Sequence, residues 1–224
     1  MRLIKAQTPL KPSHVLIDNW YSPSEEKRIW KELDFYSEKD KFERAEWQEI
    51  ATDEKGKHLG EHFRIHLDKF YTNEARDLKI SDILNFVSKA QTDDFRDAIK
   101  KCAPAYSRTF TETNISYTLV SYYDNADYYK PHHDSFFWTI LIWFYREPQA
   151  FTGGDLIFPE FHNYRVECKH NRLIAFPCFY LHGSETVNLP EEKRDKSLGK
   201  YTITHFFHFD TSRRTNNIIN EPKK

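Results

Sequence analysis

The chain has 224 residues, of which 39% are hydrophobic and 30% charged, so it is too apolar to be disordered and too polar to be a membrane bundle. Its 33 lysines and arginines balance 34 aspartates and glutamates, which argues against binding nucleic acid or an anionic membrane through bulk charge. The longest apolar run, residues 136–145, is shorter than the roughly 18 residues that a membrane-spanning helix needs. We therefore expect no membrane partner.

The cysteines and the N-terminal residues give information about the cellular compartment of the protein. The three cysteines include no CxxC pair, which is typical of a reducing compartment and offers no zinc-finger spacing. The first residues hold only a two-residue apolar patch, so we expect no signal peptide. The predicted location is the cytoplasm.

The first half of the chain predicts a strand followed mainly by helices. Residues 14–20 predict a short strand, and the serine cap, proline and glutamate of residues 22–25 predict a helix that runs to about Phe35. Residues 62–68 alternate strictly between polar and apolar side chains, which is a strand period. Residues 74–102 predict two helices with a break near residues 91–93.

Strands dominate after Ile115. Aromatic residues make up 16% of the chain and there are only six glycines, a composition that favours a sheet-rich core. We expect a single domain with N-terminal helices (1–114), a strand-rich core (115–210) and a polar tail (211–224). The predicted strands are 115–123, 127–134, 137–145, 155–158, 163–168, 171–177, 181–187 and 200–209.

A candidate metal site lies at the sequence YYKPHHD, residues 128–134. Residues two apart on a strand share a face, so His132 and Asp134 can point at one ion while His133 points away. His182, at the end of an apolar run, is the candidate third ligand. Two histidines and one carboxylate leave coordination positions open, as in non-haem Fe(II) sites. A lone HxD is a weak signal, however, and 11 histidines make a chance third partner easy to find.

The strand predicted at 200–209 indicates an anion site. Lys200, Thr202, Thr204 and Phe206 share one face. A lysine among aromatic and β-branched neighbours is costly unless it pairs with an anion, and the nearby hydroxyl of Thr202 could donate to the same anion. The alternative is that Lys200 extends to solvent at the edge of a sheet.

The order of these motifs resembles the 2-oxoglutarate- and Fe(II)-dependent oxygenases, specifically their prolyl 4-hydroxylase-like branch. The resemblance rests on residues 115–210 together with the N-terminal VLIDNWYSPSE. The matching segments are Tyr123, YYKPHHD (128–134), the run from Thr139 to Trp143, TGGDLIFPE (152–160), NRLIAFP (171–177), His182 and GKYTIT (199–204).

The resemblance implies a fold and a set of roles. The fold would be a double-stranded β-helix, or jelly roll, mainly β with N-terminal α-helices. His132, Asp134 and His182 would hold Fe(II), and Lys200 would bind the distal carboxylate of 2-oxoglutarate. The remaining roles would fall to Tyr123, Thr139, Trp143 and Thr202 in the cosubstrate pocket, and to Tyr129 facing the substrate. For Tyr123, Tyr129 and Trp143 the alternative is packing in an aromatic core.

The chain departs from the family pattern in several places, among them the segment before Tyr128 and the gap before Lys200. Asp124-Asn125-Ala126-Asp127 stands where a glycine is usual. The 18 residues from His182 to Lys200 are about twice the usual gap, and their charged insertion, NLPEEKRDKS, predicts an exposed loop on a hairpin.

The implied activity is hydroxylation of a substrate, coupled to decarboxylation of 2-oxoglutarate by O2, with ascorbate as a candidate accessory. The resemblance favours a prolyl residue in a peptide or protein, docked against a groove that Tyr129, Trp138 and Trp143 could line. A free amino acid or small metabolite is the first alternative. A demethylase of alkylated bases is a second, disfavoured by Phe206 at a position where that group has a second arginine. An inactive jelly-roll binding module is the third, and the complete set of four site residues argues against it.

Overall fold

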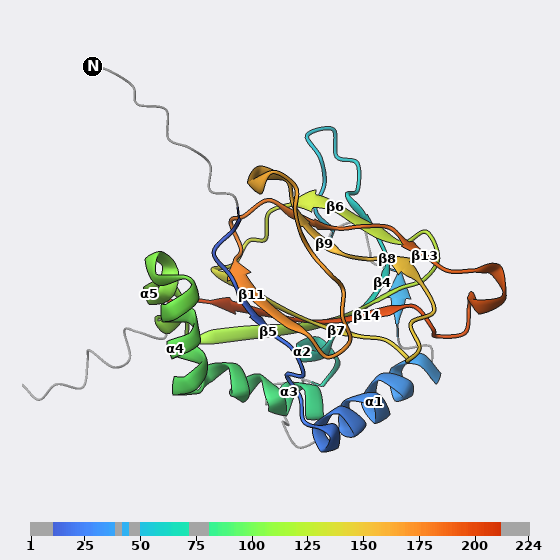
Figure 1. Cartoon of the computed structure of the whole chain (residues 1–224), viewed down its shortest axis with the longest axis horizontal. Coiled ribbons are helices and arrows are strands. Elements are labelled where there is room, and N and C mark those ends of the chain that lie inside the picture. Colours follow the sequence, from blue (N-terminus) through green and yellow to red (C-terminus); the bar gives the residue numbers. More distant parts are fainter. Residues whose placement is uncertain (1–10, 39–41, 45–49, 72–80, 212–224) are drawn as a thin grey trace, which may run out of the picture.

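Two antiparallel sheets face each other in the computed structural model, which describes residues 11–38, 42–44, 50–71 and 81–211 (Figure 1). Within these residues the larger sheet contains, in spatial order, β1 (Val15–Ile17), β11 (Leu173–Pro177), β7 (Trp138–Phe144), β14 (Lys200–His208), β5 (Ile115–Tyr123), β4 (Phe63–His66) and β2 (Glu43–Arg44). The smaller sheet contains β10 (Tyr164–Val166), β9 (Leu156–Phe158), β12 (His182–Ser184), β6 (Tyr128–His132) and β3 (Gly60–Glu61). A separate pair joins β13 (Val187–Asn188) to β8 (Thr152–Gly153).

This arrangement confirms the jelly roll expected from the sequence, with small shifts in strand boundaries. β5 spans the predicted residues, and β14 ends one residue early. The single strand expected at 181–187 is instead two strands, because the chain leaves β9 after Ser184 and then pairs with β8 from Val187. The two-residue strands β2, β3 and β8 were not predicted, since two residues are too few to show a period.

β14 forms the centre of the larger sheet and separates the cavity from the outer core. It pairs over its whole length with β5 and along most of it with β7. Alternate side chains point to opposite faces of a strand. Lys200, Thr202 and Thr204 face the space between the sheets, as predicted, whereas Tyr201 and Ile203 pack into the outer hydrophobic core.

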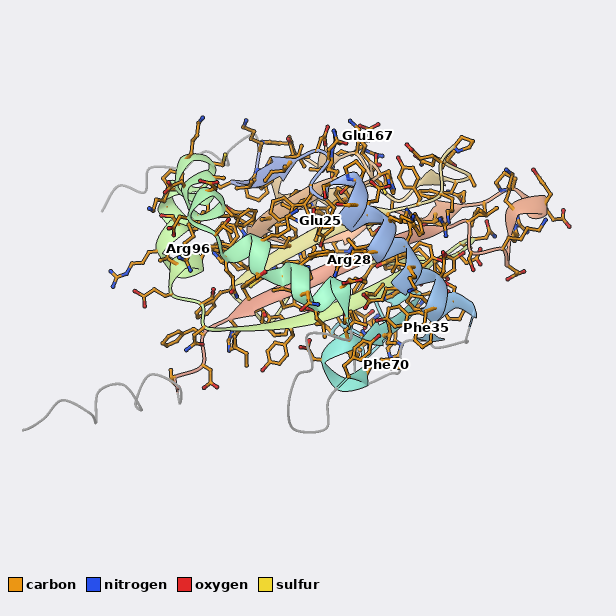
Figure 2. All side chains as sticks on the ribbon, turned by 90° about the horizontal axis from the view of Figure 1, so that it is seen from below. Glu25, Arg28, Phe35, Phe70, Arg96 and Glu167 are labelled. Carbon is orange, nitrogen blue, oxygen red and sulfur yellow. The ribbon has the colours of Figure 1, made fainter. Side chains whose placement is uncertain are left out.

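Helix α1 (Pro23–Glu38) covers the outer face of the larger sheet (Figures 1 and 2). Its predicted start is confirmed, because the backbone N–H of Ser22 donates to the Glu25 carboxylate at 2.8 Å. The indole of Trp30 contacts the ring of Tyr201 edge-on at 5.7 Å between centroids, and Ser37 Oγ lies 2.9 Å from the Tyr201 hydroxyl. These contacts fix α1 against the outward face of β14.

The remaining helices extend the same layer. They are α2 (Leu67–Phe70), α3 (Asp82–Phe86), α4 (Asp93–Cys102) and α5 (Ser107–Thr111), with 3-10 turns at Val87–Gln91 and Pro104–Tyr106. The predicted break near residues 91–93 is confirmed, since Thr92 caps α4. Residues 74–80 of the predicted helical region lie outside the described residues, and α5 was not predicted. Among the described helices, none has both the length and the apolar character to cross a membrane.

The buried carboxylate of Glu32 ties α1 to α3. It accepts hydrogen bonds from Ser81 Oγ at 2.6 Å and from the backbone N–H of Ile83 at 3.0 Å. Burial raises the pKa of Glu32, and these hydrogen bonds oppose that shift. The helical layer is therefore joined by a specific polar contact as well as by apolar packing.

Candidate active site

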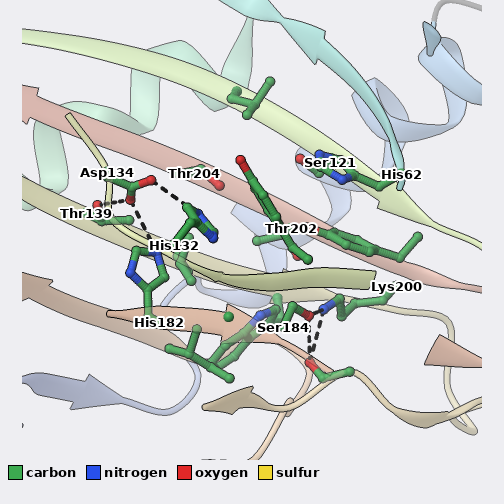
Figure 3. Close-up of a pocket in the computed structure, with 18 of the residues that line it drawn as sticks. His62, Ser121, His132, Asp134, Thr139, His182, Ser184, Lys200, Thr202 and Thr204 are labelled. Atoms are coloured by element: carbon green, nitrogen blue, oxygen red, sulfur yellow. Dashed lines mark hydrogen bonds and ion pairs between the residues drawn. The ribbon is translucent and has the colours of Figure 1, made fainter. Parts of the chain in front are cut away.

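Three potential metal ligands converge where β6 and β12 lie side by side in the smaller sheet. His132 ends β6, Asp134 follows two residues later, and His182 starts β12 as the register partner of His132. The Nε2 atoms of both histidines lie 3.4 Å from Asp134, one from each carboxylate oxygen (Figure 3). The ligand atoms of the three residues all lie within 4.8 Å of one another, and this is the single such group among the described residues.

Backbone carbonyl groups orient both histidine rings. The Nδ1 atom of His132 lies 2.9 Å from the carbonyl oxygen of Lys130, and that of His182 lies 2.8 Å from the carbonyl oxygen of Tyr180. A carbonyl oxygen can only accept, so each Nδ1 donates, and in the neutral ring the lone pair then lies on Nε2, which faces the site. This tautomer is the one that a histidine ligand of a metal needs.

The carboxylate of Asp134 is held by a neighbouring strand. Thr139 Oγ1, on β7, donates a 2.6 Å hydrogen bond to Asp134 Oδ2. Burial alone would raise the pKa of Asp134, but the adjacent imidazoles of His182 and His132 hold that pKa well below its usual range. The carboxyl group is therefore ionised and fixed, which suits a divalent cation.

The backbone between β6 and β12 is close because of Gly183. A Cβ atom at this position would lie 2.8 Å from the backbone nitrogen of Pro131 and from the carbonyl oxygen of Tyr129. Both atoms belong to the backbone and cannot swing aside. Glycine is therefore needed for His182 to reach His132 across the sheet.

His133 does not join the group. Its ring is exposed, and its Nδ1 atom lies 3.0 Å from the carbonyl oxygen of Phe179. The predicted strand register at the HxD sequence is thereby reproduced. His58, His62 and His66, whose spacing could have suggested a metal stripe on a helix, lie on or beside β3 and β4 and form no metal group among the described residues.

A cavity between the two sheets extends from this group to Lys200 (Figure 3). It leaves about 60 Å³ for the centres of water-sized molecules, and one side of it is open to solvent. Its walls include all nine predicted site residues: Tyr123, Tyr129, His132, Asp134, Thr139, Trp143, His182, Lys200 and Thr202. The structure therefore brings the predicted residues together around one space.

The far end of the cavity holds a buried cation. Lys200 is 1% exposed, and its Nζ donates to the carbonyl oxygen of Gly154 at 3.0 Å and to Ser184 Oγ. The ammonium also lies 4.1 Å from the centre of the Tyr123 ring. No carboxylate of the described residues forms an ion pair with it. Burial lowers the pKa of Lys200 to about 8.

The hydroxyl group of Thr202, two residues from this cation, has no hydrogen-bond partner among the described residues. Thr202 is 6% exposed, and its Oγ1 makes no hydrogen bond within the described part of the chain. Buried cations and buried hydroxyl groups are normally paired, because an unpaired one loses its hydration without compensation. An anion placed between Lys200 and Thr202 would satisfy both groups.

Ser184 and His62 are among the residues of the cavity wall that were not predicted as site residues. Ser184 lies two residues beyond His182, so the strand period could have indicated it, but its contact with Lys200 depends on the strand register. His62 enters from the segment between β3 and β4, and its sequence context indicated only a strand.

A groove on the outer side of the cavity reaches the same metal group. Its walls include His132, Asp134 and Tyr129, and one side is formed by the rings of Tyr117, Phe136 and Phe206. The Phe136 and Phe206 rings stack at 4.5 Å. Tyr117 is 42% exposed, so its ring is accessible at the surface of the groove.

One sequence prediction about this groove is wrong. Trp138 is fully buried, donates from its indole N–H to Thr109 Oγ1 at 2.9 Å and packs on Phe110. It points to the helical layer because it alternates with Thr139, which faces the cavity. Trp143 lines the inner cavity and not the groove. Tyr129 alone of the three aromatics borders both.

Comparison with known proteins gives agreement in structure and none in sequence. No protein-family model and no curated protein matches the chain. A prolyl-4-hydroxylase from Pseudomonas putida superposes with a TM-score of 0.56 at 13% identity, covering 89% of this chain and 94% of its own. A prolyl hydroxylase from Trichoplax adhaerens, in complex with a hypoxia inducible factor peptide fragment, gives 0.59 at 12%, covering 94% and 88%.

A third structure has the same fold. An oxidoreductase of the 2OG-Fe(II) oxygenase family from Burkholderia pseudomallei gives a TM-score of 0.54 at 11% identity, covering 88% of this chain and 85% of its own. Identities this low establish a shared fold and nothing finer. The chain therefore has the jelly-roll fold found in 2-oxoglutarate oxygenases, as its motifs suggested.

Proposed function

We propose that the protein is a 2-oxoglutarate- and Fe(II)-dependent dioxygenase that hydroxylates a prolyl residue in a peptide or protein. One observation supports the activity above all others. An open group of two imidazoles and one carboxylate shares a cavity with a buried lysine that has no carboxylate partner among the described residues. The family resemblance and the shared fold agree with it.

His132, Asp134 and His182 would hold the Fe(II). Two nitrogen ligands and one oxygen ligand leave positions free for a cosubstrate and O2, whereas a structural zinc site is closed by four protein ligands. When bound, Fe(II) and 2-oxoglutarate would supply the oxidative chemistry, in which O2 is consumed, 2-oxoglutarate becomes succinate and CO2, and the substrate gains a hydroxyl group.

Lys200 and Thr202 would bind the distal carboxylate of 2-oxoglutarate. The ammonium is already directed by Gly154 and Ser184, so little side-chain freedom remains to be lost on binding. A charge-assisted hydrogen bond in a buried site is stronger than one in water. The cavity between Lys200 and the metal group would then orient the other end of the dicarboxylate toward the metal.

Other residues of the cavity wall would exclude water from the site and orient the metal ligands. Trp143 is 2% exposed and Leu156 is 3% exposed, and both form apolar wall of the cavity. Thr139 holds the carboxylate of Asp134, and Tyr129 stacks on the ring of His132 at 3.7 Å between centroids. Exclusion of water from the cavity would limit side reactions when no substrate is bound.

The groove beside the metal group supports a peptide substrate. Proline-rich segments dock well against aromatic surfaces, because their extended conformation has little entropy left to lose. The exposed ring of Tyr117 and the stacked rings of Phe136 and Phe206 provide such a surface next to His132 and Asp134. The Trichoplax adhaerens neighbour, solved with a peptide, has the same fold.

The test is product analysis with Fe(II), 2-oxoglutarate and O2, with and without ascorbate. We expect succinate and a mass gain of one oxygen on proline-containing peptides. His133→Ala should retain this activity, and Asp134→Ala should lose it. Oxygenation of free proline alone would favour a small-molecule hydroxylase, and loss of a methyl group from methylated single-stranded DNA would favour a demethylase. Failure of the wild-type protein to form any succinate would contradict the dioxygenase assignment.

A further inference from the structure

His62 occupies the point where the chain passes from one sheet to the other. Gly60 and Glu61, just before it, form β3 and pair with β6 of the smaller sheet. Phe63, just after it, starts β4 and pairs with β5 of the larger sheet. The ring of His62 is 1% exposed and lies in the wall of the cavity, which Ser121 and Thr202 also line (Figure 3).

The ring of His62 lies between two tyrosines of the site. It stacks nearly parallel to Tyr123, with centroids 4.8 Å apart and planes 17° apart. It also contacts Tyr129, with centroids 5.2 Å apart. Each tyrosine contacts one end of the site. The Lys200 ammonium lies 4.1 Å from the Tyr123 ring, and the Tyr129 ring stacks on His132 at 3.7 Å.

A continuous column of rings therefore joins the lysine to the metal ligand. The order is Lys200, Tyr123, His62, Tyr129, His132. The column draws on β14, β5, the β3–β4 junction and β6, which supplies both Tyr129 and His132. No residue near His62 in the sequence can therefore replace its ring. Buried side chains are packed without voids, and removing a ring leaves a cavity that its neighbours fill only in part.

Gly60 gives independent support for the importance of this column. A Cβ atom at Gly60 would lie 2.8 Å from Cδ2 of the Tyr129 ring. That ring cannot move freely, because it is held between His62 and His132 and its hydroxyl accepts a hydrogen bond from the backbone N–H of Ala51 at 3.2 Å. Gly60, on β3, thus leaves the space that the Tyr129 ring occupies.

We propose that His62 is a positioning residue that holds Tyr123 and Tyr129 in place and so couples the cosubstrate end of the cavity to the metal end. The proposal rests on the proposed dioxygenase function. His62 is not one of the three residues of the metal group, and in this proposal it acts through the contacts of its ring with the two tyrosines. Loss of the ring should loosen both ends at once, which loss of Lys200 or of Thr139 should not do.

The test compares His62→Ala with His62→Phe, which keeps a ring but no ring nitrogen. Anaerobic titrations measure the dissociation constants of Fe(II) and of 2-oxoglutarate for each folded variant. In His62→Ala we expect both constants to rise about tenfold or more, as for other residues that orient metal ligands. In His62→Phe both should stay within a few-fold of wild type. Gly60→Ala should weaken Fe(II) binding more than 2-oxoglutarate binding, since it displaces Tyr129 only.

His170 provides a matched control outside the cavity. Its ring stacks on Trp30 with centroids 6.0 Å apart and planes 8° apart, in the helical layer. His170→Ala should lower the thermal midpoint of unfolding and leave both dissociation constants unchanged. If His62→Ala behaves like His170→Ala, or if His62→Phe is as impaired as His62→Ala, the proposed role of the ring is wrong. If wild type binds neither Fe(II) nor 2-oxoglutarate, the dioxygenase function itself fails.

Discussion

The two ends of the cavity differ in how far the chain completes them. At the metal end, the Nδ1 atoms of His132 and His182 donate to backbone carbonyl groups, and Thr139 donates to Asp134. At the other end, Lys200 has neutral partners only among the described residues, and Thr202 Oγ1 has none.

This difference indicates which partner each end requires. The metal end is negatively charged and preorganised, so it needs only a cation to complete it. The Lys200 end is positively charged and incomplete, so an anion would complete it. An inactive binding module would have no use for two such ends in one cavity.

The largest expected effect is at the metal end. Asp134→Ala removes the charged member of the group and should reduce Fe(II) affinity by about two orders of magnitude or more, because a charged ligand contributes more than an orienting residue, whose loss costs 10–100-fold. Anaerobic equilibrium dialysis measures the loss. His133→Ala is the control and should bind normally, since its ring is exposed and outside the group. The opposite result would mean that the register of the HxD strand is misassigned.

A similar effect is expected at the cosubstrate end from Lys200→Ala. Loss of one charged partner of a buried pair costs roughly 3–5 kcal/mol, so the dissociation constant of 2-oxoglutarate should rise by about two orders of magnitude or more. Fe(II) affinity should remain intact, because Lys200 lies at the far end of the cavity. An unchanged constant would show that Lys200 does not bind the distal carboxylate.

A smaller effect at the metal end should follow from Thr139→Val, which keeps the shape of the side chain and removes the donor to Asp134. Fe(II) affinity should fall about 10- to 100-fold, as for other residues that orient metal ligands. Thr139→Ser retains the hydroxyl and should bind Fe(II) nearly as well as wild type. Equal affinities for the valine and serine variants would show that the hydrogen bond does not orient the carboxylate.

The smallest expected effect is a pH dependence of 2-oxoglutarate binding, which arises at the Lys200 end only. Burial lowers the pKa of Lys200 to about 8, so its positive charge is lost as the pH rises through that value. The dissociation constant of 2-oxoglutarate, measured at fixed Fe(II) occupancy, should therefore be flat below about pH 8 and increase above it. Lys200→Arg stays charged throughout this range and should abolish the increase. An increase that persists in the arginine variant would assign the titration to another group.

The same shift has the opposite consequence for the stability of the protein without cosubstrate. In the unfolded chain the pKa of Lys200 returns to its ordinary value of 10.5, so between about pH 8 and 10.5 the unfolded chain holds a proton that the folded chain has released. The contribution of Lys200 to the free energy of unfolding therefore increases with pH across this window.

Much of the site could be predicted because it depends on strand period. Residues two apart share a face, which places His132 with Asp134 and Lys200 with Thr202. The same rule placed Tyr201 and Ile203 on the opposite face of β14, and these residues pack in the core beneath the helices. The same period excluded His133 from the metal group.

The rest depends on contacts between strands that the sequence does not specify. The bond from Thr139 to Asp134 joins β7 to the end of β6, and the contact of Ser184 with Lys200 joins β12 to β14. The position of His62 depends on β3 and β4 lying in different sheets, which two short pairings decide. Trp138 was misplaced because an apolar run on a strand buried on both faces does not show which side chains face the cavity.

The most direct test measures binding of Fe(II) and 2-oxoglutarate in the same cavity. 2-Oxoglutarate is titrated anaerobically into the Fe(II)-loaded protein, and the visible charge-transfer absorption of a 2-oxo acid chelated to Fe(II) is recorded. We predict a saturable absorption band for wild type and for His133→Ala, none for Asp134→Ala, and one for Lys200→Ala only at concentrations about two orders of magnitude higher. Absence of the band in wild type, or an identical titration for Lys200→Ala, would contradict the assignment of the cavity to Fe(II) at one end and 2-oxoglutarate at the other.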